Sequence, residues 1–227
     1  MKEALKQIEK AKKEAGKSVE ERLSSFRELG TKGRAYFDFR PYAELSFEAG
    51  RFSELAFCLL TAGSSALLGL KAQAALGEEG FLTAGREELE ELLKKLGHRW
   101  AGQRAERIVK ARERFPLVLK LLKEEKDAAR VRELLSSPGS PYKVEGLGLK
   151  EASHFLRNLG YDGLAIVDRH VLRFLRAHGL VRPLKTVTRK LYLEAEEALR
   201  RLARETGTSM AELDLLIFYA ATGKVLK

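Results

Sequence analysis

Cysteine is almost absent from this 227-residue sequence, which contains only Cys58. A single cysteine excludes an internal disulfide framework, a four-cysteine iron–sulfur cluster and a cysteine-rich zinc finger. The N-terminal segment lacks the apolar core of a secretory signal, and no apolar run is long enough to span a membrane. We therefore expect a reduced, cytoplasmic setting without membrane insertion.

Acidic residues are outnumbered by basic ones, with 42 Lys and Arg against 32 Asp and Glu and a formal net charge of +10. This balance favours a polyanionic partner, with nucleic acid ranked before an anionic membrane surface. The basic residues are spread along the chain rather than confined to one amphipathic segment, which argues against a membrane-surface helix. The histidines show no metal-ligand spacing, so we expect no metal site; they are His98, His154, His170 and His178.

Apolar residues recur at helical spacing almost everywhere, and no convincing alternating run is present. This periodicity predicts an all-α fold of short helices. Ser18 with Glu21 reads as a capping box for a helix that ends at Gly30, residues 31–42 read as an irregular connection, and Pro116 reads as a first helical position. Later helices are expected at 87–96, 101–115, 127–135, 149–159, 169–178, 189–205 and 210–222.

The most informative segment is 144–175, where Gly146 and Gly148 flank Leu147 immediately before a helix. Glycines allow a tight hairpin and a close backbone approach, and the amides that open the next helix can face a phosphate oxygen. This arrangement grips a DNA backbone without reading its sequence. The alternative is an ordinary corner between two helices, and the tripeptide alone favours that alternative.

Lys150 lies in the first turn of that helix, where the helix dipole disfavours a cation. A neutral amine there is a nucleophile that can form a Schiff base with an aldehyde-like carbon. The alternative is a solvated lysine that contacts phosphate. Eighteen residues later Asp168 precedes another helix, where it can cap the helix and also stabilise cationic character in a sugar.

A basic stripe follows on the next helix, formed by Arg169, Arg173 and Arg176. It can follow a phosphate backbone or simply be a solvated face. His170 beside it is read as structural or phosphate-facing rather than catalytic.

These residues together resemble a known family. The elements Gly146-Leu147-Gly148-Leu149-Lys150 and Val167-Asp168-Arg169-His170 are similar to those of the helix–hairpin–helix DNA glycosylases with a downstream Gly/Pro-Asp element. The segment GHRWAGQRAERI at 97–108 and the terminal TGKVLK resemble the second, archaeal-type branch of 8-oxoguanine DNA glycosylase/AP lyases. The resemblance covers most of the chain from about residue 50 onward.

The resemblance implies a helix–hairpin–helix glycosylase fold with two helical subdomains and a DNA-binding cleft between them. We place one subdomain at residues 51–160 and the other at 1–50 plus 161–227. It also implies a base-excision-repair enzyme that acts as a monomer on double-stranded DNA containing 8-oxoguanine, associated with the prokaryotic nucleoid. Lys150 would attack the sugar of a flipped nucleotide, and β-elimination would then cleave the strand, with Asp168 stabilising the sugar cation.

Further roles are implied residue by residue. Trp100, Phe218 and Lys227 would recognise the base, although the family has tryptophan where this chain has Phe218. Gly146, Gly148, Arg169, His170 and Arg173 would contact the DNA backbone. No cofactor is implied, apart from a monovalent cation on the hairpin carbonyls.

Two alternatives stay open. One is a helix–hairpin–helix glycosylase for another damaged base, which would share Lys150 and Asp168. The absence of a four-cysteine cluster already argues against the endonuclease III and adenine-glycosylase branches. The other is a non-catalytic DNA-binding module that uses only the hairpin and the basic stripe.

Overall fold

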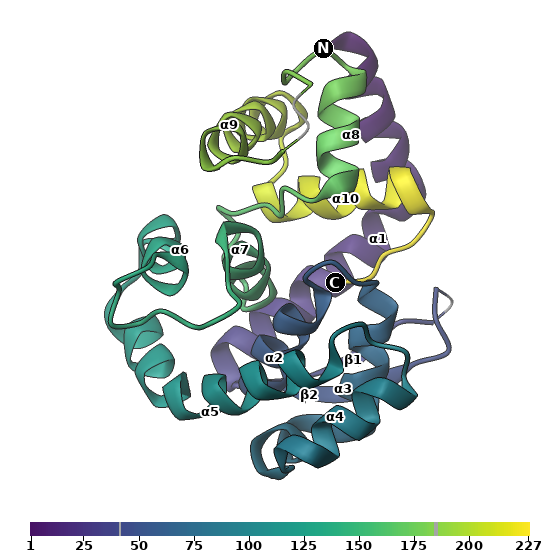
Figure 1. Ribbon diagram of the computed structural model, residues 1–227. Helices are drawn as coiled ribbons and strands as arrows, with labels where there is room; N and C mark the ends of the chain where they lie inside the picture. Colours follow the sequence, from purple (N-terminus) through teal and green to yellow (C-terminus); the bar gives the residue numbers. More distant parts are fainter. Residues whose placement is uncertain (41, 184–185) are drawn as a thin grey trace.

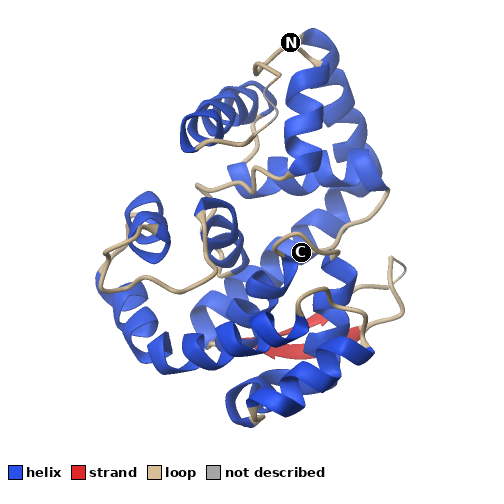
Figure 2. Cartoon of the chain, viewed as in Figure 1, coloured by secondary structure: helices blue, strands red, loops and turns tan. Residues whose placement is uncertain are grey.

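The computed structural model describes residues 1–40, 42–183 and 186–227. Helices dominate it, with one small antiparallel sheet (Figure 2). The elements in chain order are α1 (Lys2–Lys32), β1 (Arg34–Asp38), β2 (Ser46–Gly50), α2 (Arg51–Thr61), α3 (Ala66–Thr83), α4 (Arg86–Lys95), α5 (Ala101–Glu124), α6 (Ala128–Ser136), α7 (Leu149–Asn158), α8 (Arg169–Ala177), α9 (Arg189–Thr206) and α10 (Met210–Thr222). Within these residues no helix is long and apolar enough to cross a membrane.

The helices form two groups. Helices α8, α9 and α10 gather around the N-terminal half of α1, whereas α2 to α5 and the small sheet lie at its other end (Figure 1). Helix α1 contacts α10 and α9 in the first group and β1 and α7 toward the second. Thirty-one residues make a helix of about 46 Å, which is long enough to join both groups. The chain boundaries proposed above for two subdomains stay a prediction.

The prediction of a helix start at Ser18 and a stop at Gly30 is wrong. Helix α1 is continuous from Lys2 to Lys32 because its buried stripe continues toward the N-terminus through Ala4, Ala11 and other small residues. These alanines carry too little hydrophobicity to stand out in the sequence. A Cβ at Gly30 would lie 2.0 Å from the carbonyl oxygen of Leu159, so this glycine lets α1 pass close to the end of α7.

The stretch 31–42 is also more regular than expected, apart from residue 41, which lies outside the described residues. Strand β1 pairs with β2, with Phe37 opposite Phe47. The burial of β1 alternates, so that Ala35 and Phe37 face the core while their neighbours are exposed. An alternation of apolar and polar residues over only five positions is too short to identify a strand reliably from the sequence.

The later helices follow the predicted pattern closely. Helix α10 spans the predicted residues, and its N-cap Ser209 accepts a hydrogen bond from the Glu212 amide, 3.0 Å away. Pro116 does not begin a helix but lies inside α5. The prediction of a helical fold is confirmed, and the described residues add one short antiparallel strand pair, β1 with β2.

Candidate active site

A large cleft of about 1770 Å³ lies where the two groups of helices meet. Its lining comes from α7, α8 and α10, from the α2–α3 turn and from the C-terminal tail. Basic side chains outnumber carboxylates among the described lining residues: Lys150, Arg157, Arg169, Arg173, Arg176, Arg189, Lys224 and Lys227 face Glu151, Asp168 and Asp214. A concave surface of this sign attracts an anionic polymer.

The predicted hairpin is present just before α7. The Leu147 amide donates to the Val144 carbonyl at 3.1 Å and closes a tight turn. Gly146 has a φ of 93°, and a Cβ there would lie 2.9 Å from Leu59. Gly148 is the N-cap of α7, and no side chain caps this helix. The amides of its first turn are therefore available to an anion, as expected for a phosphate grip.

Lys150 follows directly in the first turn of α7 and faces the cleft. Its Nζ lies 3.3 Å from Oε1 of Glu151, and 29% of its side chain is exposed. The lysine is thus accessible from the cleft while one carboxylate holds its ammonium. This pair has to open before the amine can act as a nucleophile.

Asp168 is the N-cap of α8, as the sequence predicted. Its Oδ1 accepts hydrogen bonds from the amides of His170 and Val171 at 2.8 and 2.9 Å. In the described part of the chain no hydrogen bond is made by Oδ2. The carboxylate is thereby fixed by one oxygen and presents the other at a cleft that it shares with Lys150.

Three more predicted residues of α8 line the same cleft: Arg169, His170 and Arg173. The His170 ring meets the ring of Phe218 edge-on, with centroids 5.3 Å apart. Phe218 comes from α10, so the structure brings together residues that are 48 positions apart in the sequence.

Trp100 is placed differently. It is not among the described residues that line the cleft, and 58% of it is exposed. Its φ of 55° is the only positive value for a non-glycine residue in the described ranges. A Cβ on Gly63, which does line the cleft, would lie 3.9 Å from the Trp100 ring, so the tryptophan stands at the rim.

The C-terminal residue lies at the wall of the cleft. The Lys227 side chain is fully buried, with its Nζ 2.6 Å from Glu54 and 2.9 Å from Gln73 Oε1. The same ammonium lies 3.9 Å from the centre of the Phe37 ring. Burial lowers the pKa of Lys227, and the Glu54 carboxylate opposes this shift.

A second buried ion pair links the walls of the cleft, and sequence reasoning missed it. Arg157 of α7 donates to Asp214 of α10 at 3.2 Å, and the Ile166 amide donates to the same carboxylate oxygen at 3.1 Å. Burial raises the pKa of Asp214 to about 7; Arg157 lowers it and Asp168 raises it. Asp214 therefore ties α10 both to the helix of Lys150 and to the loop that leads to Asp168.

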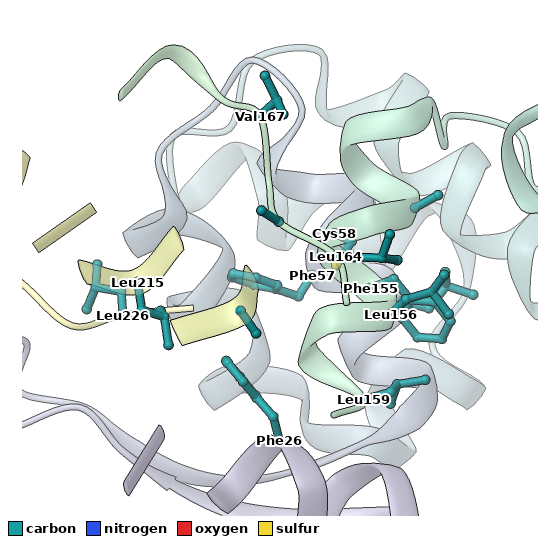
Figure 3. Close-up of a cluster of buried hydrophobic side chains, with 14 of the residues drawn as sticks. Phe26, Phe57, Cys58, Phe155, Leu156, Leu159, Leu164, Val167, Leu215 and Leu226 are labelled. Atoms are coloured by element: carbon teal, nitrogen blue, oxygen red, sulfur yellow. The ribbon is translucent and has the colours of Figure 1, made fainter. Parts of the chain in front are cut away.

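Buried apolar side chains pack around the polar groups of the cleft. Figure 3 shows Phe57, Phe155 and Leu156 in a cluster with side chains of α10 and the tail, including Leu215 and Leu226. Such close packing fixes the helices that carry the polar groups of the site. The signal that could have identified Arg157 and Asp214 is their position among apolar residues of amphipathic helices, where a charge needs a partner.

No group of three or more His, Cys, Asp or Glu side chains that could hold a metal ion occurs among the described residues. His154 lines the cleft with its ring edge-on to that of Phe57, at 5.3 Å between centroids, and burial lowers its pKa well below the usual value. A neutral imidazole is therefore expected there.

Comparisons with known proteins agree with one another. The sequence model of the family Ogg-HhH, 8-oxoguanine DNA glycosylase, matches residues 19–208. The chain is 56% identical over 225 residues to the 8-oxoguanine DNA glycosylase/AP lyase of Aquifex aeolicus, which covers 99% of this chain and 100% of the relative. It is 40% identical over 228 residues to the protein of that name from Thermotoga maritima, with both chains covered completely.

Solved structures give the same result. A Methanocaldococcus jannaschii 8-oxoguanine glycosylase/lyase, crystallised with a 15mer DNA containing 8-oxoguanine, superposes with a TM-score of 0.83 at 40% identity. That match covers 98% of this chain and 99% of the other. The 8-oxoguanine DNA glycosylase of Thermotoga maritima superposes with a TM-score of 0.81 at 39% identity, with both chains covered completely.

Proposed function

This chain belongs to the 8-oxoguanine DNA glycosylase family, and on that premise we propose that it excises 8-oxoguanine from duplex DNA and cleaves the strand through a Schiff base at Lys150. The premise rests on the family match over residues 19–208 and on relatives that are similar over their whole length. The observation that carries the assignment of residues is the shared cleft. Lys150 at the start of α7 and Asp168 at the start of α8 both line it, surrounded by basic side chains.

The reaction begins with the DNA backbone. The uncapped amides of α7 and the glycines of the hairpin bind phosphate groups, while Arg169 and Arg173 lie along the neighbouring helix. The glycosidic bond of a stacked base is out of reach, so the damaged nucleotide has to leave the duplex and enter the cleft. The cleft has ample room for a nucleotide.

Lys150 then acts as the nucleophile. Its neutral amine attacks C1′ of the deoxyribose, the C1′–N9 bond breaks, and the base leaves with that electron pair and takes up a proton. The attached nitrogen loses one proton; the C1′–O4′ bond then opens, O4′ takes up a proton, and a protonated Schiff base is left between C1′ and the lysine nitrogen. Loss of a proton from C2′ then drives β-elimination, which breaks the C3′–O bond on the 3′ side of the lesion. Asp168 stabilises the positive sugar through its free Oδ2.

Base recognition falls to the residues opposite the hairpin. Phe218 offers an aromatic face and Lys227 a chain terminus at the wall of the cleft. 8-Oxoguanine has a donor at N7 where guanine has an acceptor, so one well-placed oxygen separates the two bases. Trp100 is proposed to join them from the rim once DNA is bound. The amine and the carboxylate supply all the reactive groups, so we propose that catalysis needs no cofactor.

The protein is further proposed to act as a monomer in the cytoplasm, where a prokaryotic chromosome is accessible. This setting agrees with the net positive charge and the single buried cysteine, Cys58. For the described residues the structure shows only that no helix is long and apolar enough to span a membrane.

Single-turnover excision and nicking test this proposal with three duplexes that contain 8-oxoguanine, guanine or a different oxidised base. We expect the wild type to excise 8-oxoguanine and to nick the strand, with little action on guanine. Lys150→Gln is expected to lose both activities while its DNA affinity survives. Lys126→Gln, which removes an exposed lysine at the end of α5, serves as the control.

Three results would contradict the proposal in different ways. Faster excision of the other oxidised base would agree with the proposed mechanism but would show that 8-oxoguanine is not the preferred substrate. Undiminished excision by Lys150→Gln would show that this lysine is not the nucleophile. If the wild type excised no damaged base, the protein would be interpreted as a non-catalytic DNA-binding module.

A further inference from the structure

One carbonyl group of the hairpin already accepts from a cation of the chain itself. The ammonium of Lys143 donates to the carbonyl oxygen of Leu147, within the hairpin. It also donates to the carbonyl oxygen of Ser136 at 2.9 Å. Ser136 is the last residue of α6, so one lysine ties the end of that helix to the turn before α7.

Lys143 suits this position for physical reasons. Carbonyls in the last turn of a helix lack intrahelical partners and lie at the negative end of the helix dipole, where a cation is favourable. The side chain is half-buried, and burial lowers its pKa, whereas the nearby carboxylates of Glu151 and Glu145 oppose that shift. The ammonium is thus held by two backbone oxygens and by negative charge around it.

This arrangement does not fit the monovalent cation that the family resemblance implied for the hairpin. A cation from solution needs several carbonyl oxygens with free lone pairs that point at one centre. Here the Leu147 oxygen accepts from an ammonium, and the Val144 oxygen accepts from the Leu147 amide at 3.1 Å. A second positive charge beside the ammonium would also be repelled strongly in this half-buried place.

We propose that the Lys143 ammonium is the built-in cation of the hairpin and that it replaces a monovalent ion taken from solution. The ammonium holds the Leu147 carbonyl on the inner side of the turn, which leaves the amides of Gly148, Leu149 and Lys150 for the phosphate, whereas the Leu147 amide closes the turn onto Val144. Ser136, Ser137 and Pro138 line the cleft, so the lysine lies next to the surface where the backbone of the DNA is bound. This inference rests on the proposed function, because it concerns how the hairpin binds DNA.

Fluorescence anisotropy with a duplex that contains a stable abasic-site analogue tests the proposal without catalysis. Affinity is measured at one ionic strength in potassium, sodium or tetramethylammonium chloride. Tetramethylammonium screens charge equally but is too large to enter a ring of carbonyls. We expect the dissociation constant of the wild type to change by less than about twofold among the three salts, since ionic strength alone sets the screening.

Lys143→Met gives the complementary result. In tetramethylammonium it is expected to bind about fivefold more weakly than the wild type, because a cation that supports the hairpin is lost. Potassium or sodium should restore part of that loss, since the freed carbonyls can accept an ion. Lys126→Met is the matched control, because Lys126 also donates to a carbonyl near a helix end, that of Leu122, but lies outside the cleft. It is expected to bind as the wild type does, or slightly more weakly in all three salts.

A wild-type protein that binds several-fold more tightly in potassium than in tetramethylammonium would overturn the proposal, and this arm needs no variant to fold. Equal binding of Lys143→Met and the wild type in tetramethylammonium would overturn it as well. Failure of the wild type to bind the duplex in any salt would instead contradict the proposed function.

Discussion

The ammonium of Lys227 lies 2.6 Å from the carboxylate of Glu54, and neither side chain exposes any surface. Glu54 also accepts a hydrogen bond from Asn158 at 2.6 Å, so the pair belongs to a buried network between α2, α7 and the tail. Such a pair demands good geometry on both sides, because an unpaired buried charge is costly. The last residue of the chain is therefore held firmly at the wall of the cleft.

Breaking this pair should destabilise the protein strongly. Glu54→Gln leaves the Lys227 ammonium buried without its counter-charge, and we expect the free energy of unfolding to fall by about 3–5 kcal/mol. Glu28→Gln removes a carboxylate from an exposed pair with Lys32 and should change stability by less than about 0.5 kcal/mol. Urea unfolding of the wild type and both variants measures how much each ion pair contributes to the free energy of unfolding. Equal midpoints for Glu54→Gln and the wild type would contradict the prediction.

Lengthening the chain past Lys227 tests the role of the terminus itself. Because Val225, Leu226 and Lys227 are all buried beside the cleft, two added residues must enter it or displace the tail. We expect single-turnover excision of 8-oxoguanine to slow by about tenfold or more, equivalent to at least about 1.4 kcal/mol in the barrier. The same two residues placed before Met1, which is exposed, form the control. Unchanged kinetics of the C-terminally extended protein would take the terminus out of base recognition.

Asp168 combines a structural and a chemical role, and two substitutions separate them. Asparagine is a good N-cap, so Asp168→Asn should keep stability within about 0.5 kcal/mol, whereas Asp168→Ala should lose about 1 kcal/mol. Both variants lose the negative charge opposite the sugar, and we expect excision to slow by about 10²–10³-fold in each. Thermal unfolding measures the loss of the helix cap, and single-turnover rates measure the loss of the catalytic role. An active Asp168→Asn protein would show that capping is the only role of this side chain.

The ionisation of Asp214 should appear as a pH dependence of stability. Burial raises its pKa to about 7 from an ordinary value of 3.8, so the folded state binds a proton more tightly than the unfolded state between these values. Stability that this group contributes is present at low pH and is lost as the pH rises through that window. Relative to Asp214→Asn, the wild type should lose on the order of 2 kcal/mol between pH 5 and 7.5.

Denaturant unfolding of both proteins at the two pH values measures this difference. The comparison removes the contribution of His154, whose lowered pKa acts in both proteins alike. A difference between the two proteins that stays constant with pH would show that Asp214 keeps its charge throughout, held by Arg157.

The sequence predicted the parts of this molecule that depend on local chemistry. The cap at Asp168, the turn at Gly146 and the first-turn position of Lys150 follow from residue types and spacing, and the structure has them where expected. What the sequence could not show are relationships across the fold. Nothing local indicates that Asp214 meets Arg157, since these side chains come together only when α10 packs near α7.

The roles of residues that depend on tertiary packing were also not predicted. Gly30 resembles a helix stop, but the nearby backbone of Leu159 is what requires glycine there. Lys143 drew no notice because an ordinary lysine in a turn-rich stretch gives no signal until Ser136 and Leu147 are placed around it.

A Schiff base between Lys150 and the deoxyribose can be trapped by reduction. The protein is incubated with an 8-oxoguanine duplex and a borohydride reductant, and the covalent complex is digested and mapped by mass spectrometry. We expect a lesion-dependent adduct on the peptide that carries Lys150, and we expect no adduct with the undamaged duplex or with Lys150→Gln. An adduct on another lysine of the cleft, such as Lys224, or no adduct with the lesion duplex, would contradict this expectation.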